Sequence, residues 1–456
     1  MNDSRPNILI LIPHDLGDML GCYGRSTVAS PNLDALASRG VRLSQCFCAG
    51  PACSPSRASL FTGLHPHANG MCGLANFGWR LTQPHLAERL AAIGYETHQF
   101  GFQHEAHGPV ENLGYRHVHR PSDVTGRAAN DARIVCRELA GFLEREPVSD
   151  RPWFACAGFF HVHRPWPETT RFAPSDLEVP PYLPDLPAVR EDLAQFHESI
   201  AEMDAAVGTA LDSLAGSAHA ERTLVVFTTD HGPGLPRAKA TLYDPGLRVA
   251  MLLHQPGRIE GGRVMHGLVS NADFAPTILW LLGEDVPEEM HGRSFAASLT
   301  GADAEGRDAT FSSLLYDVAY DPMHCVRTPT HKYIRSFAVT DADAAGADRD
   351  VLASHAAGQW VRVDDFDVLS SPTWRAIASP QPKPRREELY DIEADPHEQA
   401  NLASDPDASD VLTSMRKRLD DWMDRTDSPL RHGHVTPPPE QKQASERYRH
   451  GGPMYG

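Results

Sequence analysis

The sequence of 456 residues is poor in positive charge and in long apolar runs, and it holds only eight cysteines. Its 42 lysines and arginines are outnumbered by 60 aspartates and glutamates, which gives a formal net charge of −18. Because nucleic-acid binding needs a basic face, this balance argues against nucleic acid as a partner. The negative charge also disfavours binding along a long polyanion, whereas it is compatible with a small anionic ligand in a locally basic pocket.

No stretch of the sequence approaches the length of a membrane span. The apolar run at 7–13 is too short for a signal peptide or a membrane helix and predicts a buried strand. We therefore expect a cytoplasmic protein with no membrane partner. A chain this long without a leader is not a disulfide scaffold, so most cysteines are expected to be small buried side chains.

Short apolar strands alternate with amphipathic helices over the first two thirds of the chain. Such an alternation predicts a mostly parallel sheet covered by helices on both faces. We predict strands at 7–13, 95–100, 153–160, 223–229 and 249–254, and helices at 31–40, 85–93, 127–145, 187–214 and 272–282.

The pattern changes after about residue 303. Polar, alanine-rich loops at 339–358 separate strand-like pieces at 332–334 and 360–363, and a helix is predicted at 409–424. We expect a large domain, a smaller α+β subdomain with an antiparallel sheet, and a polar tail. The tail is either disordered or an arm that joins copies in a homo-oligomer. The three parts are predicted at 1–303, 304–433 and 434–456.

Two predicted strands end in residues that could hold a metal ion. His14 and Asp15 follow the first strand, and Asp230 and His231 follow the strand at 223–229. In open α/β sheets, ligands gather at the carboxyl ends of strands. A single aspartate after a strand is commonly only a turn cap. Two such pairs of oxygen and nitrogen donors favour a metal site, with capping as the alternative.

The segment from Cys53 to Arg57 predicts the start of a helix. Ser54 is the expected N-cap and Pro55 the first helical residue. The Cys53 side chain would then lie over unpaired backbone N–H groups, a position suited to anions. Taken alone, the pattern favours a buried thiol beside an ordinary helix cap.

The longer segment 53–63, Cys-Ser-Pro-Ser-Arg-Ala-Ser-Leu-Phe-Thr-Gly, resembles the sulfatase signature. In that signature, a cysteine followed two residues later by proline and four later by arginine is oxidised to formylglycine. The resemblance covers roughly residues 6–425 and implies an alkaline-phosphatase-like fold, with 1–303 as the catalytic domain. Within the family it is strongest to the N-sulfoglucosamine sulfohydrolases. Further segments that carry the likeness are 30–40, 158–166, 179–184, 229–232, 241–246, 273–277 and 388–403.

The resemblance implies a role for each matching residue. Formylglycine at Cys53, made by a formylglycine-generating enzyme, is hydrated, and one hydroxyl attacks sulfur to leave a covalent sulfate ester. The remaining hydroxyl then expels sulfate. Arg57 stabilises the ionised hydroxyl and His104 hydrogen-bonds the diol. Lys239 holds sulfate oxygens, and His163 protonates the leaving nitrogen or oxygen.

The resemblance also implies one divalent cation, which family likeness makes calcium. Its expected ligands are Asp15, Asp230 and His231, with His14 and the modified Cys53 beside them. The site has more nitrogen and less negative charge than calcium prefers, so manganese and zinc stay open as alternatives.

Two positions depart from the family's pattern, and one distant histidine is a further candidate. His14 stands where the family usually has an aspartate, and Phe102 stands where it usually has a lysine. A cation for sulfate is therefore missing or comes from elsewhere. His324, in the predicted C-terminal subdomain, is a candidate for facing the substrate.

The leading hypothesis is an exo-acting hydrolase of a sulfate ester or sulfamate on a small sulfated amino sugar or short oligosaccharide. N-sulfoglucosamine is the favoured substrate. One alternative is a phosphonate monoester or phosphodiester hydrolase with the same modified cysteine. The other is a catalytically inactive binding protein, which Phe102 favours and the intact Cys53, Pro55 and Arg57 oppose.

Overall fold

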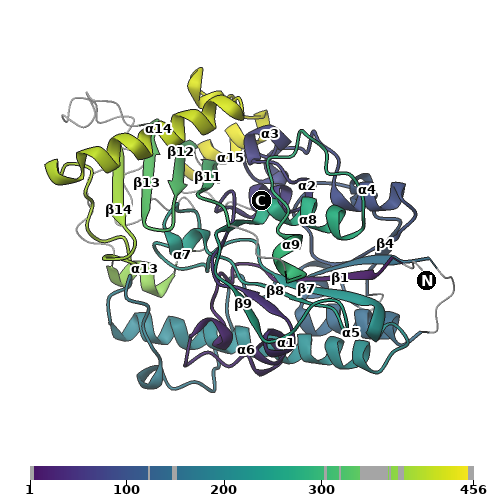
Figure 1. Cartoon of the computed structure of the whole chain (residues 1–456). Coiled ribbons are helices and arrows are strands. Elements are labelled where there is room, and N and C mark those ends of the chain that lie inside the picture. Colours follow the sequence, from purple (N-terminus) through teal and green to yellow (C-terminus); the bar gives the residue numbers. More distant parts are fainter. Residues whose placement is uncertain are drawn as a thin grey trace.

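The computed structural model describes residues 5–121, 124–145, 151–301, 306–317, 320–338, 368, 371–377 and 385–449. They form a large α/β unit with a smaller antiparallel sheet beside it (Figure 1), so the predicted fold class is confirmed. The loop at 339–358 and the strand predicted at 360–363 lie outside the described residues. Within the described part of the chain, no helix is long and apolar enough to span a membrane.

An eight-stranded sheet forms the centre of the large unit, in the order β5-β4-β6-β1-β7-β8-β2-β9. Neighbours from β5 to β7 are parallel, whereas β8 runs antiparallel to both β7 and β2. The strands are β1 (Asn7–Ile12), β2 (Val41–Leu43), β4 (Glu96–Gly101), β5 (His117–His119), β6 (Trp153–Gly158), β7 (Thr223–Thr228), β8 (Met251–His254) and β9 (Arg263–Met265). A two-stranded piece pairs β3 (Cys46–Phe47) with β10 (Val269–Ser270).

Helices cover both faces of this sheet, because its central strands are apolar on both sides. In β1, Ile8, Ile10 and Ile12 belong to one core cluster, and Leu9 and Leu11 belong to the other. The first cluster packs against α2 (Cys53–Thr62), α4 (Leu86–Ala92) and α8 (Phe274–Leu281). The second packs against α1 (Pro31–Arg39), α5 (Ala132–Leu143) and α6 (Pro187–Ala215) (Figure 1). Shorter helices are α3 (Pro66–Asn69), α7 (Asp244–Leu247), α9 (Ala296–Leu299) and α13 (Pro372–Ile377).

Two predicted helix starts were wrong. The helix predicted from residue 127 begins at Ala132, because the Asp131 side chain accepts the Arg133 N–H as an N-cap, and a 3-10 turn precedes it. Helix α2 begins at Cys53 with Ala52 as N-cap, so Ser54 is not the cap. The Ser54 hydroxyl instead accepts a hydrogen bond from the backbone of Ala75 at 3.0 Å.

The second sheet consists of β11 (Thr310–Tyr316), β12 (Tyr320–Arg327), β13 (His331–Ser336) and β14 (Glu387–Asp391), all antiparallel. Helix α14 (Ser409–Arg425) lies along it (Figure 1). Its buried face holds Leu412, Met415, Leu419 and Trp422 at helical spacing, and the helix predicted at 409–424 is confirmed.

The described part of the tail differs from the expectation of disorder or an oligomer arm. Residues 434–438 lead into α15 (Pro439–Arg449), which packs on the same chain. The Trp79 indole donates to the Gln441 side chain at 2.9 Å, and Gln441 and Ala444 are buried. A buried indole N–H needs an acceptor, and the polar tail supplies it.

A buried ion-pair network joins the second sheet to the large unit. The Lys332 ammonium on β13 lies 2.5 Å from Asp244 Oδ1 and 2.7 Å from Glu398 Oε1, and its side chain is fully buried. It also donates to the carbonyl of Leu242 at 3.0 Å. Asp244 also pairs with Arg248 at 3.3 Å and with Arg327 at 3.4 Å. Burial raises the pKa of Glu398, which pairs with Lys332, to about 7. Removing Lys332 would leave the buried Glu398 without its cation and would weaken the compensation of Asp244.

We predict that Lys332→Met lowers the free energy of unfolding by about 3–5 kcal/mol, because it breaks a buried pair by removing one partner. Urea denaturation of the full chain measures this change. Arg133→Met is the matched control, because it breaks an exposed pair with Asp131 worth ~0–1 kcal/mol. Equal losses in the two variants would contradict the prediction.

Candidate active site

Four adjacent parallel strands end at one edge of the large sheet. Ile12 of β1 is in register with Gly158 of β6, which is also in register with Gly101 of β4. On the other side, Leu11 of β1 pairs with Phe227 of β7. The loops that follow these strand ends carry the predicted site residues His14, Asp15, His104, His163, Asp230 and His231.

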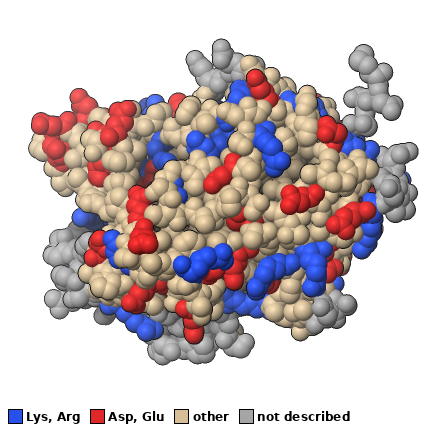
Figure 2. Space-filling view, turned by 90° about the horizontal axis from the view of Figure 1, so that it is seen from below, with Lys and Arg blue, Asp and Glu red and all other residues tan. Residues whose placement is uncertain are grey.

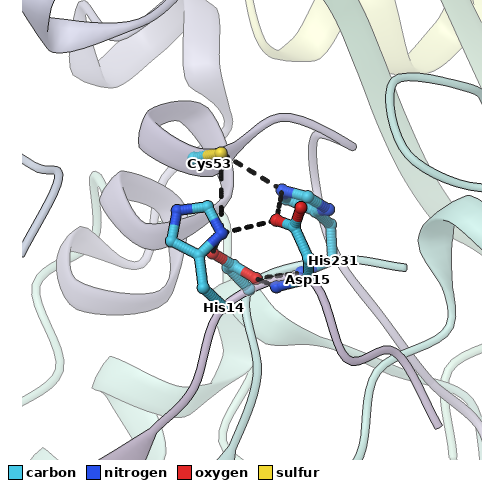
Figure 3. Close-up of side chains that lie close together, drawn as sticks. His14, Asp15, Cys53 and His231 are labelled. Atoms are coloured by element: carbon cyan, nitrogen blue, oxygen red, sulfur yellow. Dashed lines mark hydrogen bonds and ion pairs between the residues drawn. The ribbon is translucent and has the colours of Figure 1, made fainter. Parts of the chain in front are cut away.

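Five side chains meet at this edge. His14, Asp15, Cys53, Asp230 and His231 each offer one potential ligand atom, and these atoms all lie within 4.8 Å of one another. All five side chains are buried, and Figure 3 shows the four that it labels pointing toward one another. The structure thus brings together the complete set that the sequence singled out for a metal ion.

The Cys53 sulfur lies at the centre of this cluster, at the first residue of α2. Its Sγ is 3.3 Å from His231 Nε2 and 4.0 Å from His14 Nδ1 (Figure 3). Burial raises the pKa of the thiol well above its usual value, although Lys239 acts in the opposite direction. Cys53 is therefore a protonated thiol at neutral pH, which is a weak nucleophile.

Hydrogen bonds join the N-terminal half of α2 to the segments that follow β1 and β7. Arg57 donates from Nε to Asp230 Oδ2 at 3.1 Å and from Nη2 to the carbonyl of Pro13 at 3.0 Å. The Ser56 hydroxyl donates to the carbonyl of Asp230. The sequence pattern Ser-Pro-Ser-Arg thus holds Cys53 over the two strand ends.

Positive groups compensate the two buried carboxylates. Lys239 Nζ donates to Asp15 Oδ2 at 2.8 Å, and Arg57 holds Asp230. Burial alone would raise the pKa of Asp15, but Lys239 and the neighbouring imidazoles hold it well below its usual value. The pKa of Asp230 is likewise lowered against the effect of burial, through His14, His231 and Arg57. Both carboxylates are therefore ionised and available to a cation.

His163 lies beside Lys239 with its ring oriented by the backbone. Its Nδ1 donates to the carbonyl of Arg164 at 2.7 Å, and its Nε2 is 3.1 Å from Lys239 Nζ. The same Nε2 is 3.8 Å from Asp15 Oδ2. Since Nδ1 carries a proton, Nε2 is the atom that can accept or release one.

His104 also lies at this edge, and it brings two residues that the sequence analysis missed. Its Nε2 is hydrogen-bonded to Asn76 Oδ1 at 3.3 Å, and its backbone N–H donates to the Glu105 carboxylate at 2.9 Å. Glu105 is buried 3.8 Å from Arg57 Nη1, and burial raises its pKa. Glu105 could have been found from the sequence because it directly follows His104, whereas no sequence pattern pointed to Asn76.

The two departures from the family's pattern are in contact. The rings of His14 and Phe102 lie 5.1 Å apart, and the Arg57 guanidinium lies 5.3 Å from the Phe102 ring centre. An aspartate at 14 and a lysine at 102 would bring one negative and one positive charge to this place. The chain has two aromatic rings there instead.

The structure does not bring His324 into this cluster. Its side chain is fully buried, and its Nε2 is 2.8 Å from the Ser428 hydroxyl. Its ring packs against His67, Phe337 and Trp422. This placement is a packing position under α14, so the expectation that His324 faces the substrate lacks structural support.

We predict that His14→Asp and Phe102→Lys compensate each other. His14→Asp adds a negative charge at a buried position, and Phe102→Lys adds a positive charge at a half-buried one. Each single variant should lower the free energy of unfolding, whereas the double variant pairs the two charges. The double-mutant cycle should give a coupling of about 0.5–3 kcal/mol in favour of the pair. Urea denaturation in the presence of a chelator measures it without a contribution from bound ions.

Phe102→Leu is the control for loss of the ring without added charge, and it should show no favourable coupling with His14→Asp. Strictly additive losses in the charged cycle would contradict the idea that the two departures belong together.

Comparison with known proteins assigns the chain to a family. The model of the sulfatase family matches residues 6–284, and the model of the C-terminal region of N-sulphoglucosamine sulphohydrolase matches residues 237–343. Human N-sulphoglucosamine sulphohydrolase is 30% identical over 93% of this chain and 91% of its own length. An ulvan-active sulfatase of Formosa agariphila is 28% identical over 92% of this chain and 75% of its own length.

Among solved structures, the phosphonate monoester hydrolase of Agrobacterium radiobacter is similar with a TM-score of 0.68 and 20% identity. The match covers 92% of this chain and 96% of that one, and at this identity it shows a shared fold alone. The family match extends over more than half of the chain and includes Cys53, Arg57 and Asp230. The chain belongs to the sulfatase family and is an enzyme of that class.

Proposed function

We propose that this sulfatase removes sulfate from a sulfated amino sugar, with N-sulfoglucosamine as the favoured substrate, through formylglycine at position 53 and one divalent cation. The observation that carries the proposal is the position of Cys53. Cys53 is the first residue of the signature Cys-Ser-Pro-Ser-Arg. Its side chain is buried beside the two ionised carboxylates, and its sulfur lies 3.3 Å from His231 Nε2. Conversion to formylglycine would supply a hydrated aldehyde oxygen where the thiol is a weak nucleophile.

The donor set at the strand ends fits a divalent cation. It consists of two carboxylates, from Asp15 and Asp230, and two imidazoles, from His14 and His231, beside position 53. Calcium is the ion implied by family likeness, but it prefers an all-oxygen shell. The nitrogen donors favour manganese or zinc over calcium. When bound, the ion would supply a Lewis acid to the attacking oxygen.

The remaining polar groups can bind and protonate the substrate. Lys239 offers an ammonium group for sulfate oxygens beside Asp15, and Arg57 keeps a second positive charge next to position 53. His163 Nε2 can hold the proton that the leaving nitrogen or oxygen needs. His104, with its Nδ1 buried and without a partner among the described residues, offers an acceptor for the hydrated aldehyde.

Two findings support an amino-sugar sulfamate as substrate. The matched C-terminal region of N-sulphoglucosamine sulphohydrolase spans Lys239 and the strands β11 to β13 of the second sheet. The human enzyme of that name is aligned with this chain over nearly the whole length of both. The name of that relative specifies N-sulfoglucosamine, the substrate that we propose for this chain.

The charge of the molecule supports attack on a terminal residue. The net charge of −18 repels the interior of a long polyanion. Figure 2 shows acidic side chains interspersed with basic ones over one face, so this face has no uninterrupted basic track. Binding a terminal sugar needs only local cations such as Lys239.

We predict that co-expression with a formylglycine-generating enzyme converts Cys53 to formylglycine. Mass spectrometry of the signature peptide should show the mass change from thiol to aldehyde. Cys53→Ala should abolish turnover and leave the fold intact, as judged by circular dichroism. The neighbouring Cys48, which is also buried, is the control and should stay unmodified. A signature peptide that carries only unmodified cysteine would count against the mechanism.

We also predict that N-sulfoglucosamine is cleaved at least as well as longer sulfated chains, with weak dependence on salt because few ion pairs form. Sulfate release from a panel of N-sulfoglucosamine, O-sulfated sugars and aryl phosphonate measures the preference. Release from O-sulfated sugars alone would exclude the sulfamidase assignment and keep a sugar sulfatase. Preference for the phosphonate over every sulfate would exclude both.

A further inference from the structure

A polar cavity lies between the large unit and α14, away from Cys53. It has a volume of about 560 Å³, and its walls include His65, Arg293 and Arg307 from the large unit and Trp422 and Arg425 from α14. A neighbouring hollow of about 330 Å³ shares Arg293 and Arg307 with it.

This cavity is remote from the catalytic cluster. Cys53 is the first residue of α2, and His65 lies beyond its last residue, Thr62. A helix of 10 residues spans about 15 Å, so α2 separates the two sites by roughly that length. None of the cavity's wall residues belongs to the catalytic cluster.

The walls are rich in positive charge, in contrast to the acidic molecule. They hold the cations Arg293, Arg307, Lys417, Arg418 and Arg425 against the two carboxylates of Asp308 and Asp421. Three of the cations are engaged, because Arg307 pairs with Asp273, Arg418 with Asp308 and Lys417 with Asp421.

The other two cations are exposed at the surface, where a ligand can reach them. Within the described residues, neither the Arg293 nor the Arg425 guanidinium makes a hydrogen bond, and neither has a carboxylate within 4.0 Å. Arg293 comes from the large unit and Arg425 from the last turn of α14. An anion held by both would bridge the two parts of the molecule.

One wall residue, His65, is a buried histidine with an unpaired donor. His65 is 5% exposed, and its Nε2 accepts the Trp422 indole N–H at 3.1 Å. Burial, together with His291 and His67, holds the pKa of His65 well below its usual value, so the ring is neutral. Its proton therefore lies on Nδ1, which is buried and has no partner among the described residues. A buried donor without an acceptor is costly unless a ligand or water satisfies it.

We propose that this cavity is a second anion site that binds a tetrahedral oxyanion, sulfate or phosphate, either free or as an ester group on a sugar. Arg293 and Arg425 supply the charged hydrogen bonds, and the neutral His65 ring forms part of the wall. The site does not depend on the substrate proposed for the catalytic centre, because it shares no residue with it.

The test uses isothermal titration of the full-length Cys53→Ala protein, which cannot turn over a substrate at the catalytic centre. Sodium sulfate, sodium phosphate and a sulfated disaccharide are titrated separately. Arg293→Gln with Arg425→Gln should remove one binding event and raise its Kd at least about tenfold. Lys239→Met should leave that event unchanged, since it alters only the catalytic site. Circular dichroism checks the fold of each variant.

Arg137→Gln is the matched control, because it removes an exposed arginine on α5 and should not alter binding. Binding of sulfate or phosphate alone identifies a site for the free anion, whereas binding of the disaccharide only identifies a site for an ester group. The proposal is overturned if no probe binds, or if the double arginine variant loses no more affinity than Arg137→Gln.

Discussion

Two buried carboxylates at the ends of neighbouring parallel strands impose the arrangement of the whole site. Asp15 and Asp230 are nearly inaccessible to solvent, and the backbone N–H of Asp15 donates to Asp230 Oδ1 at 3.0 Å. Buried charges persist only where positive groups and hydrogen bonds compensate them. Lys239 and Arg57 provide that compensation, and the link from Arg57 to Asp230 also fixes the first turn of α2. The position of Cys53 is thus a consequence of charge balance.

The same constraint accounts for the two departures from the family's pattern. His14 and Phe102 together remove one expected carboxylate and one expected cation, so the balance around Asp15 and Asp230 is kept. The exchange is local, since the two rings touch and Phe102 also faces the Arg57 guanidinium. What changes is the donor chemistry, because an imidazole nitrogen replaces a carboxylate oxygen beside the ion position. The fold tolerates this substitution, and the proposed ion site would then favour transition metals over calcium.

The sequence predicted the sheet and the strand-end residues because their signals are local. Apolar runs such as 7–13 and 223–229 are followed at once by polar pairs, and parallel strands bring such ends to one edge. Placement that depends on distant partners was not predictable in this way. Ser54 forms its hydrogen bond with Ala75, and the tail is held by Trp79, and neither partner has a signature in the local sequence. His324 was expected at the substrate, but its strand carries it under α14, beside Ser428.

The central claim is that the strand ends hold a cation through imidazole nitrogen as well as carboxylate oxygen. The metal K-edge X-ray absorption spectrum of the zinc-loaded protein, compared with that of His14→Asp, tests it most directly. The account predicts scattering from two imidazoles in the unaltered protein and from one in the variant, since His14 and His231 both face the ion position. An all-oxygen shell that is identical in the two proteins would contradict the account.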